Sequence, residues 1–265
     1  MPDIVPAHAQ GEEAAAQPAR QGGRSRRDSL PFLHLLPNLV TVLGLCAGLT
    51  SIRFVLAGRY ELAAVLIIFA ALIDGLDGLL ARRLKAASTF GAELDSLADF
   101  ISFGVAPGLL VFQFALIGAR GFGWIAVLVF AICCCLRLAR FNVTRDAPPP
   151  PGRACFTGVP APAGAMLALM PVFLGLEGLV AASAVAVPTA VYLGLVALLM
   201  VSRIPTPSLK GLRISRDKVP YVLVAAAIVV GMAFTRFWLL MILANLAYVA
   251  AVAHGLVAAR RKPSL

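Results

Sequence analysis

Residues 61–99, ELAAVLIIFAALIDGLDGLLARRLKAASTFGAELDSLAD, combine a long apolar run with a series of aspartates. The run that contains Asp74 and Asp77 is long enough to cross the roughly 30 Å hydrocarbon core of a bilayer as a helix. The whole chain has only 13 Asp and Glu among 265 residues, and its mean hydropathy is +0.89. Because carboxylates within a membrane are costly, their concentration in this stretch indicates a functional site.

The composition around this stretch is that of a membrane protein. Hydrophobic residues make up 60% of the chain and charged residues only 14%, and apolar runs of about 20 residues recur along it. Backbone polar groups in lipid must be hydrogen-bonded within the protein, so such runs form helices. We therefore expect an all-α integral membrane protein, a bundle of about eight transmembrane helices. The expected spans lie near 37–57, 61–82, 91–117, 122–142, 159–178, 180–202, 218–235 and 237–258.

Basic residues predict the orientation of these spans. With eight spans, all but four of the 23 Lys and Arg residues fall on one side, the exceptions being Arg53, Arg59, Arg120 and Arg236. The positive-inside rule then places both termini and the stretch 82–91 in the cytoplasm, with the protein in the cell (inner) membrane. The net charge of +10 does not indicate a nucleic-acid partner, because the basic residues are divided among short loops.

The two ends of the chain differ from the membrane domain. Residues 1–30 are rich in Ala, Gln, Gly, Pro and Arg without an apolar core, so we expect a disordered cytoplasmic tail and no cleavable signal sequence. Residues 31–259 form the expected transmembrane domain, with 61–117 as its motif helices, and 260–265 form a basic cytoplasmic tail. The consecutive cysteines 133–135 are interpreted as helix packing, because no metal site uses that spacing.

The aspartates repeat at helical spacing in two neighbouring spans. Residues three or four apart share one face of a helix, which groups Asp74, Asp77, Gly78 and Ala81 on the first span and Gly91, Asp95 and Asp99 on the next. Since the loop between them has only about eight residues, the two helices are expected to be antiparallel neighbours. The four carboxylates then converge near the cytoplasmic surface, where we expect the active site.

Carboxylates held this close in a poor dielectric need protons or a cation among them. No cysteine is near in the sequence, and the histidines are His8, His34 and His254. Ligation by oxygen alone favours Mg²⁺ or Mn²⁺, and bound Mg²⁺ commonly completes its shell with phosphate oxygens, which indicates a phosphate-bearing substrate. Arg82, one turn beyond Gly78, is placed to neutralise such a phosphate. A single intramembrane carboxylate has structural and proton-path alternatives, but four on facing stripes are harder to explain in that way.

The pattern D-x2-D-G-x2-A-R-x8-G-x3-D-x3-D, which runs from Asp74 to Asp99, resembles the signature of the CDP-alcohol phosphatidyltransferase family at all eight specified positions. The resemblance implies that Asp74, Asp77 and Asp95 are metal ligands. It implies that Asp99 also lies near the metal and is the catalytic general base. By the same resemblance, Gly78, Arg82 and Gly91 line the cytidine diphosphate site.

Three further segments resemble the membrane-embedded phosphatidylserine synthases of this family. They are LPNLVT at 36–41, LRLARFNV at 136–143 and FTGVPAPAGA at 156–165. The third departs from the pattern at Val159, where leucine is common, and at Ala161, where a small hydroxyl residue is common. This resemblance implies CDP-diacylglycerol and L-serine as the substrates.

Polar residues in and around these segments are candidates for substrate contact. Asn38 and Thr41 are expected to bind CDP-diacylglycerol, although polar residues at the membrane interface would also suit a helix start. A carboxylate or phosphate of the substrates needs donors on the cytoplasmic side, with anchoring of a helix end as the alternative role for arginine. The candidate donors are Arg137, Arg140, Asn142 and Lys210.

The expected reaction is direct displacement, in which Asp99 takes the proton of the acceptor hydroxyl and CMP leaves. The shared motif does not identify the alcohol, so glycerol 3-phosphate, inositol phosphate and choline are alternative acceptors. A divalent-cation transporter is a more distant alternative, because it predicts carboxylates across the membrane, whereas Glu61 and Glu177 lie at the expected outer edge. The family also suggests a homodimer, without indicating its face.

Overall fold

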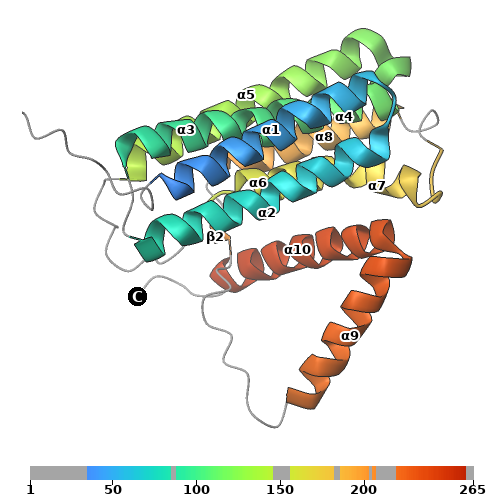
Figure 1. Ribbon diagram of the computed structural model, residues 1–265. Helices are drawn as coiled ribbons and strands as arrows, with labels where there is room; N and C mark the ends of the chain where they lie inside the picture. The colour runs from blue at the N-terminus through green and yellow to red at the C-terminus, as the bar shows by residue number, and fades with distance from the viewer. Residues whose placement is uncertain are drawn as a thin grey trace, which may run out of the picture. The chain divides into compact units, whose positions relative to one another are not determined.

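The computed structural model describes residues 35–84, 88–145, 156–181, 186–202, 205–206 and 219–260 (Figure 1). The expected N-terminal tail, Lys210 and residues 261–265 lie outside these ranges, so the predictions made for them stay predictions.

The described chain is almost entirely helical, as its composition predicts. The first part contains α1 (Leu36–Leu56), α2 (Tyr60–Leu84), α3 (Thr89–Asp99), η2 (Phe100–Val105), α4 (Ala106–Val111), η3 (Phe112–Leu116), η4 (Ile117–Ala119) and α5 (Arg120–Arg145). The second part contains α6 (Ala161–Ala168), α7 (Met170–Leu176), α8 (Ala186–Val201), α9 (Val219–Thr235) and α10 (Phe237–Arg260). Two short strands, β1 (Phe156–Thr157) and β2 (Pro205–Thr206), pair antiparallel, with Phe156 opposite Thr206.

Helices of membrane-spanning length confirm that this is a helical membrane protein. Within the described residues, five helical segments are long and apolar enough to cross a bilayer: Leu36–Leu56, Tyr60–Leu84, Thr89–Ala119, Gly121–Thr144 and Phe237–Gly255. The expected spans at 180–202 and 218–235 correspond to shorter apolar helices, Ala186–Val201 and Pro220–Thr235. A total of about eight spans is therefore not established by helix length.

The expected span at 159–178 is broken into α6 and α7 at Leu169. Pro171 lies in the first turn of α7, and it has no N–H to donate to the carbonyl four residues earlier, at Leu167. The Tyr192 hydroxyl of α8 donates to that carbonyl at 2.9 Å instead. Pro171 thus explains the break between α6 and α7, and the Tyr192 hydroxyl satisfies the carbonyl that the break leaves without a helical partner.

The third span is irregular next to the aspartates. After Asp99 the helix passes through the π-helical turn η2 and re-enters α geometry at Ala106, just before Pro107. Proline cannot donate the next helical hydrogen bond, which accounts for the loosened turn before it. Single π-helical turns occur frequently at functional sites.

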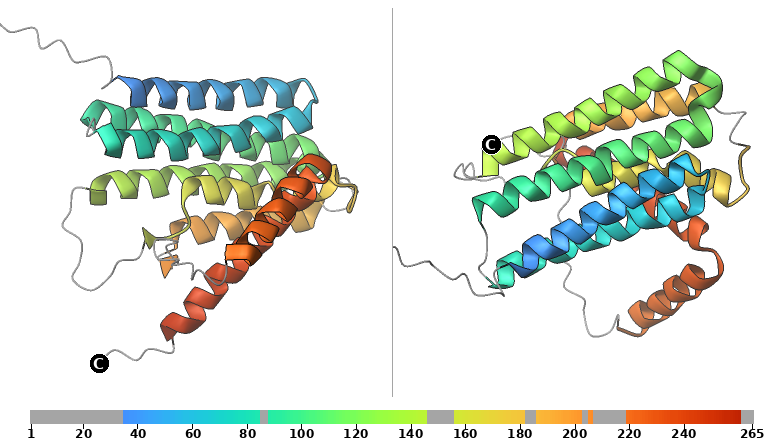
Figure 2. Two further views of the ribbon diagram at one scale, coloured as in Figure 1. Left: turned by 60° about the horizontal axis from the view of Figure 1, so that its bottom comes forward. Right: turned by 45° about the horizontal axis from the view of Figure 1, so that its top comes forward.

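Small residues bring α1 close to this irregular span. A Cβ on Gly48 would overlap the Ser102 hydroxyl and lie 3.0 Å from the Ser102 Cα, and a Cβ on Gly44 would lie 3.2 Å from the Ile73 side chain. Glycines four residues apart therefore let α1 approach both η2 and α2. Figure 2 shows α1, α2, α3 and α5 running side by side, which places the C-terminal end of α2 and the start of α3 at the same end of the bundle.

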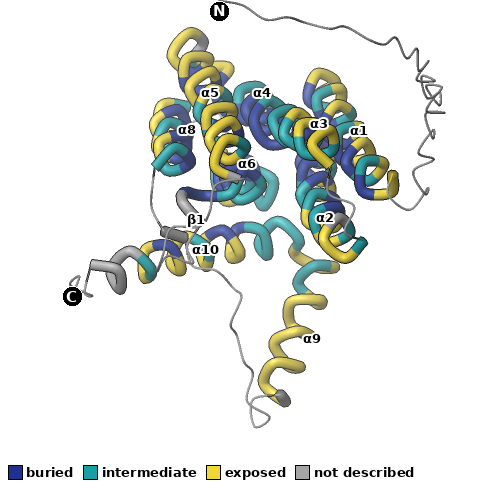
Figure 3. Tube along the Cα trace, turned by 90° about the vertical axis from the view of Figure 1, so that its left-hand side faces the viewer, coloured by how far each residue is buried: buried dark blue, intermediate teal, exposed yellow. Residues whose placement is uncertain are grey.

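The buried core and the exposed periphery are distributed unevenly (Figure 3). The centre is formed by α4 and by the inner faces of its neighbours, with Phe103, Leu110 and Phe130 almost completely buried. Most described side chains of α9 are exposed, as expected for an apolar helix that faces lipid. In α10, Trp238 stacks on Phe173 of α7 with ring centroids 5.9 Å apart, so this helix is attached to the bundle.

The segment FTGVPAPAGA mainly positions α6 against α8. Gly158 has a φ of 88°, which favours glycine, and a Cβ there would lie 2.8 Å from the Ser202 carbonyl oxygen. A Cβ on Gly164 would lie 2.6 Å from the Met200 sulfur. The two glycines therefore let the segment before and within α6 pack tightly on the end of α8.

Candidate active site

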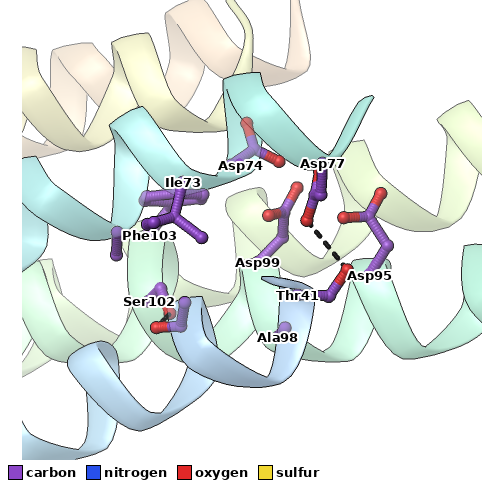
Figure 4. A pocket seen from close by; sticks show the side chains of 11 residues that line it. Thr41, Ile73, Asp74, Asp77, Asp95, Ala98, Asp99, Ser102 and Phe103 are labelled. Atoms are coloured by element: carbon purple, nitrogen blue, oxygen red, sulfur yellow. Dashed lines mark hydrogen bonds between the residues drawn. The ribbon is translucent and has the colours of Figure 1, made fainter. Parts of the chain in front are cut away.

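The four aspartates of the motif lie on two facing helices (Figure 4). Asp74 and Asp77 come from α2, and Asp95 and Asp99 from α3. Helix α3 begins at Thr89, directly after its N-cap Ser88, whose hydroxyl accepts a hydrogen bond from the Gly91 N–H at 3.0 Å. This cap fixes where α3 begins and therefore which face its aspartates share. All four side chains line one small cavity.

Three of the carboxylates form a group with metal-ligand geometry. Asp74, Asp95 and Asp99 each offer an oxygen, and the three oxygens lie within 4.8 Å of one another. The cavity between them has a volume of about 10 Å³, room for roughly one water molecule or ion. A half-buried set of oxygen donors around a space of this size fits a hard divalent cation.

Asp77 is held differently from the other three aspartates. It is 6% exposed, and its Oδ2 accepts a hydrogen bond from the Thr41 hydroxyl of α1 at 2.8 Å. Thr41 is itself buried and also reaches the Pro37 carbonyl at 3.1 Å. Asp77 thus lines the cavity with one oxygen oriented by α1. Its expected role as a metal ligand, like those of the other three aspartates, stays a prediction.

Positive charge reaches the carboxylates from α5. The Arg137 guanidinium interacts electrostatically with both Asp74 and Asp99. The aspartates repel one another: the Asp99 carboxylate interacts unfavourably with the negative charges of Asp74, Asp95 and Asp77. A cation at the centre of the cluster and Arg137 at its side would both reduce this repulsion.

The residues expected to line the nucleotide site lie in two different environments. A Cβ on Gly78 would meet no atom within 4 Å, so this glycine borders open space that a ligand can enter. The exposed Arg82 donates from Nε to the Gly78 carbonyl at 3.0 Å. In contrast, a Cβ on Gly91 would lie 2.6 Å from the Asn38 Oδ1. Gly91 therefore permits close packing of α3 on α1, and Asn38 lies at that contact.

The residues expected on the acceptor side are not gathered together. Arg140 donates to the Val201 carbonyl of α8 at 2.9 Å, which joins two helices. Asn142 accepts from the Ser96 hydroxyl at 3.0 Å and donates to Glu93 at 3.5 Å, which joins α5 to α3. Among the described members of this set, Arg137 is the one that interacts with Asp74 and Asp99. Lys210 lies outside the described residues.

Sequence reasoning missed Ser102 on the wall of the cavity. Its hydroxyl is buried and lies 3.4 Å from the Gly44 carbonyl. Its position three residues after Asp99, on the same helical face, was the available signal.

Comparison with known proteins bears on the chemistry of this site. A family model described as CDP-alcohol phosphatidyltransferase matches residues 34–196. Relatives described as CDP-diacylglycerol--serine O-phosphatidyltransferase occur in Mycobacterium leprae (strain TN), Helicobacter pylori (strain ATCC 700392 / 26695) and Bacillus subtilis (strain 168).

The similarity to these relatives is partial in length. The M. leprae protein is 49% identical over 145 residues, which are 54% of this chain and 47% of the relative. The H. pylori protein is 37% identical over 142 residues, 54% of this chain and 59% of the relative. The B. subtilis protein is 34% identical over 134 residues, 51% of this chain and 73% of the relative. The chain thus spans about half the length of the first of these relatives.

Proposed function

This chain belongs to the CDP-alcohol phosphatidyltransferase family, and we propose that it transfers the phosphatidyl group of CDP-diacylglycerol to the hydroxyl of L-serine, which gives phosphatidylserine and CMP. One observation carries the proposal: Asp74 and Asp77 of α2 face Asp95 and Asp99 of α3 across one cavity. The names of the relatives support serine as the acceptor.

The family generally depends on a divalent metal ion, and the acidic cluster fits one. We propose Mg²⁺ or Mn²⁺, held by Asp74, Asp95 and Asp99 with Asp77 as a further ligand. Such an ion would supply charge neutralisation for the pyrophosphate of the substrate. Thr41 orients Asp77 through their hydrogen bond, and Gly78 leaves the space through which the nucleotide approaches.

The protein groups account for the remaining steps. Asp99 accepts the proton of the serine hydroxyl while the serine oxygen forms a bond to the phosphorus that carries diacylglycerol. The bond from that phosphorus to the bridging oxygen breaks, and CMP leaves with the electron pair. Arg82, exposed beside Gly78, binds a phosphate oxygen of the nucleotide, and Arg137 offers positive charge on the acceptor side.

The location of the site follows from the same proposal. With the positive-inside rule, the end of the bundle that contains the start of α3 faces the cytoplasm, so CDP-diacylglycerol enters from the cytoplasmic leaflet. We propose about eight crossings with both termini in the cytoplasm, in the cell (inner) membrane. A homodimer, suggested by the family, stays a prediction.

The experiment that tests the proposal measures CMP release by the detergent-purified protein. CDP-diacylglycerol and Mg²⁺ or Mn²⁺ are supplied, with L-serine and glycerol 3-phosphate offered separately. We expect CMP release when L-serine is the acceptor and none when glycerol 3-phosphate is the acceptor. We expect EDTA to abolish the release with L-serine. Release with glycerol 3-phosphate instead would retain the metal site and contradict serine as the acceptor. No release with any alcohol would contradict the transferase assignment.

A further inference from the structure

Two buried polar atoms have no hydrogen-bond partner within the described part of the chain. They are the Nε of Arg137 on α5 and the hydroxyl of Tyr248 on α10. Buried polar groups in folded proteins are almost always paired with protein, water or ligand. These two atoms therefore mark a place where a polar partner beyond the described residues, such as a water molecule or a ligand, is expected.

The two unpaired groups are neighbours of each other and of the carboxylates. Arg137 interacts electrostatically with Tyr248 as well as with Asp99 and Asp74. Tyr248 interacts in turn with Arg137. Arg137 is thus the group that interacts electrostatically both with Tyr248 and with the carboxylate cluster.

Helix α10 is fixed where it presents Tyr248. Asn245, three residues earlier and 6% exposed, donates from Nδ2 to the Met166 carbonyl of α6 at 3.0 Å. Ile242, one turn earlier again, is buried in the core. Because these contacts set the rotation of α10, the side on which Tyr248 lies is determined by packing.

The space beside Tyr248 is large enough for a small ligand. Asn245 and Tyr248 line a cavity of about 170 Å³, and its other walls are apolar, from Ala163, Met166, Phe173, Met241 and Ala244. For comparison, a cavity of about 150 Å³ admits benzene. The apolar walls offer the Tyr248 hydroxyl no partner, and the charged group that acts on it is Arg137.

The chemistry of the pair selects an anion. A guanidinium N–H and a phenol O–H are both donors, and one of them carries positive charge. Of the three charged or polar groups of L-serine, only the carboxylate would be repelled by the aspartates, so it needs such donors to approach them. We propose that Arg137 and Tyr248 together bind the carboxylate of the acceptor amino acid, so that α10 contributes to acceptor specificity.

This inference rests on the proposed function, and it assigns a role to a helix outside residues 34–196, the part matched by the family model. With its carboxylate at Arg137 and Tyr248, L-serine can direct its hydroxyl toward Asp99, the neighbour of Arg137. Tyr248 is then a binding residue for the acceptor and takes no part in the proton transfer.

The test compares Tyr248→Phe, which removes only the hydroxyl, with Tyr221→Phe on α9, whose side chain is 77% exposed. Steady-state CMP release gives the KM for L-serine and for CDP-diacylglycerol. L-serine methyl ester, assayed as a substrate or as a competitive inhibitor, reports binding without the carboxylate charge.

We expect Tyr248→Phe to raise the KM for L-serine about tenfold, the usual effect of losing a hydrogen bond to a charged group. The KM for CDP-diacylglycerol and the affinity for the ester stay within twofold of the Tyr221→Phe values. Arg137→Lys, which keeps the charge but removes the Nε donor, is expected to raise the same KM.

Three outcomes would overturn the inference. A KM for L-serine that is equal in Tyr248→Phe and Tyr221→Phe would show that the hydroxyl does not bind the acceptor. A parallel loss of affinity for L-serine, its ester and CDP-diacylglycerol would show a structural role for Tyr248. Wild-type protein that releases CMP with glycerol 3-phosphate and not with L-serine would contradict the proposed function itself. That last result needs no variant, so the two failures are distinguishable.

Discussion

At the scale of single residues, the site depends on side chains that orient the aspartates. The Thr41 hydroxyl lies 2.8 Å from Asp77 Oδ2 and 3.1 Å from the Pro37 carbonyl. The shorter contact is to the Asp77 carboxylate, and a hydrogen bond to an ionised carboxylate is stronger than one to a neutral carbonyl. A threonine that resembles a local helix-start residue in the sequence is therefore a link from α1 to the aspartate motif.

Replacement of Thr41 by valine is expected to weaken the site without unfolding the helix. A hydrogen bond to a charged group contributes about 1.5–3 kcal/mol, so roughly a tenfold or greater rise in the Mn²⁺ concentration for half-maximal CMP release is expected. Thr50→Val is the matched control, because Thr50 of the same helix donates to the Cys46 carbonyl at 2.6 Å and has no hydrogen bond to a carboxylate of the described residues. Equal metal dependence of the two variants would contradict the role of Thr41.

Asp99→Asn is expected to separate chemistry from binding. The amide keeps the size of the side chain but cannot accept the serine proton, and loss of a general base costs about 10²–10⁴-fold in rate. CMP release should fall by such a factor, while binding of CDP-diacylglycerol, measured by equilibrium dialysis of labelled substrate, changes much less. Turnover within a few-fold of wild type would exclude Asp99 as the base.

At the scale of helices, glycines decide which elements touch. Gly48 lets α1 approach the backbone of η2 at Ser102, whereas Gly75 of α2 is exposed and a Cβ there would meet nothing within 4 Å. The π-helical turn of η2 lies next to Asp99, so the approach of α1 also sets the position of that aspartate. Packing of two helices and geometry of the site are thus coupled at one contact.

Gly48→Ala is expected to destabilise the bundle and Gly75→Ala is not. The added methyl group at position 48 must displace Ser102, and forced overpacking of this kind costs about 1–3 kcal/mol. At position 75 the helix gains up to about 1 kcal/mol from the higher propensity of alanine. Thermal unfolding in detergent, followed by circular dichroism, should give a lower midpoint for the first variant alone. Equal midpoints would contradict the close contact of α1 with η2.

At the scale of the whole molecule, a salt bridge and a side-chain hydrogen bond add to the stacking of Trp238 on Phe173 in attaching the last helices to the bundle. Arg236, between α9 and α10, forms a salt bridge of 2.9 Å with Glu177 after α7, and Asn245 binds the Met166 carbonyl. The junction of α9 and α10 and the end of α7 lie at one end of the bundle, and the end of α2 and the start of α3 lie at the other (Figure 1). The salt bridge therefore connects segments that lie away from the start of α3.

Membrane topology follows from the number of crossings. In a variant without native cysteines, Arg59→Cys and Leu179→Cys are expected to react with a membrane-impermeant maleimide in intact cells. Arg83→Cys should react only after the membrane is permeabilised, because the basic stretch after α2 is expected in the cytoplasm. Retained CMP release would show that each variant is folded. Labelling of Leu179→Cys on the side of Arg83→Cys would contradict a crossing by residues 161–176.

The sequence by itself determined the helical membrane class, the facing aspartates and the family. Helical spacing is a local property, so Asp74, Asp77, Asp95 and Asp99 could be assigned to two faces without knowledge of the packing. The short loop between the helices was enough to bring those faces together. These predictions succeeded because they depended on residues close in the chain.

Only the tertiary structure decided which distant residues meet the motif. Arg137 and Arg140 are three apart on α5, yet one interacts with Asp99 and the other binds the end of α8. Gly78 and Gly91 both belong to the motif, yet the first borders open space and the second packs on Asn38. Tyr248 is brought to Arg137 by the packing of α10 on α6 and α7. Spacing along one helix gives its faces, but the rotation and neighbours of each helix are set by side-chain packing across the whole bundle.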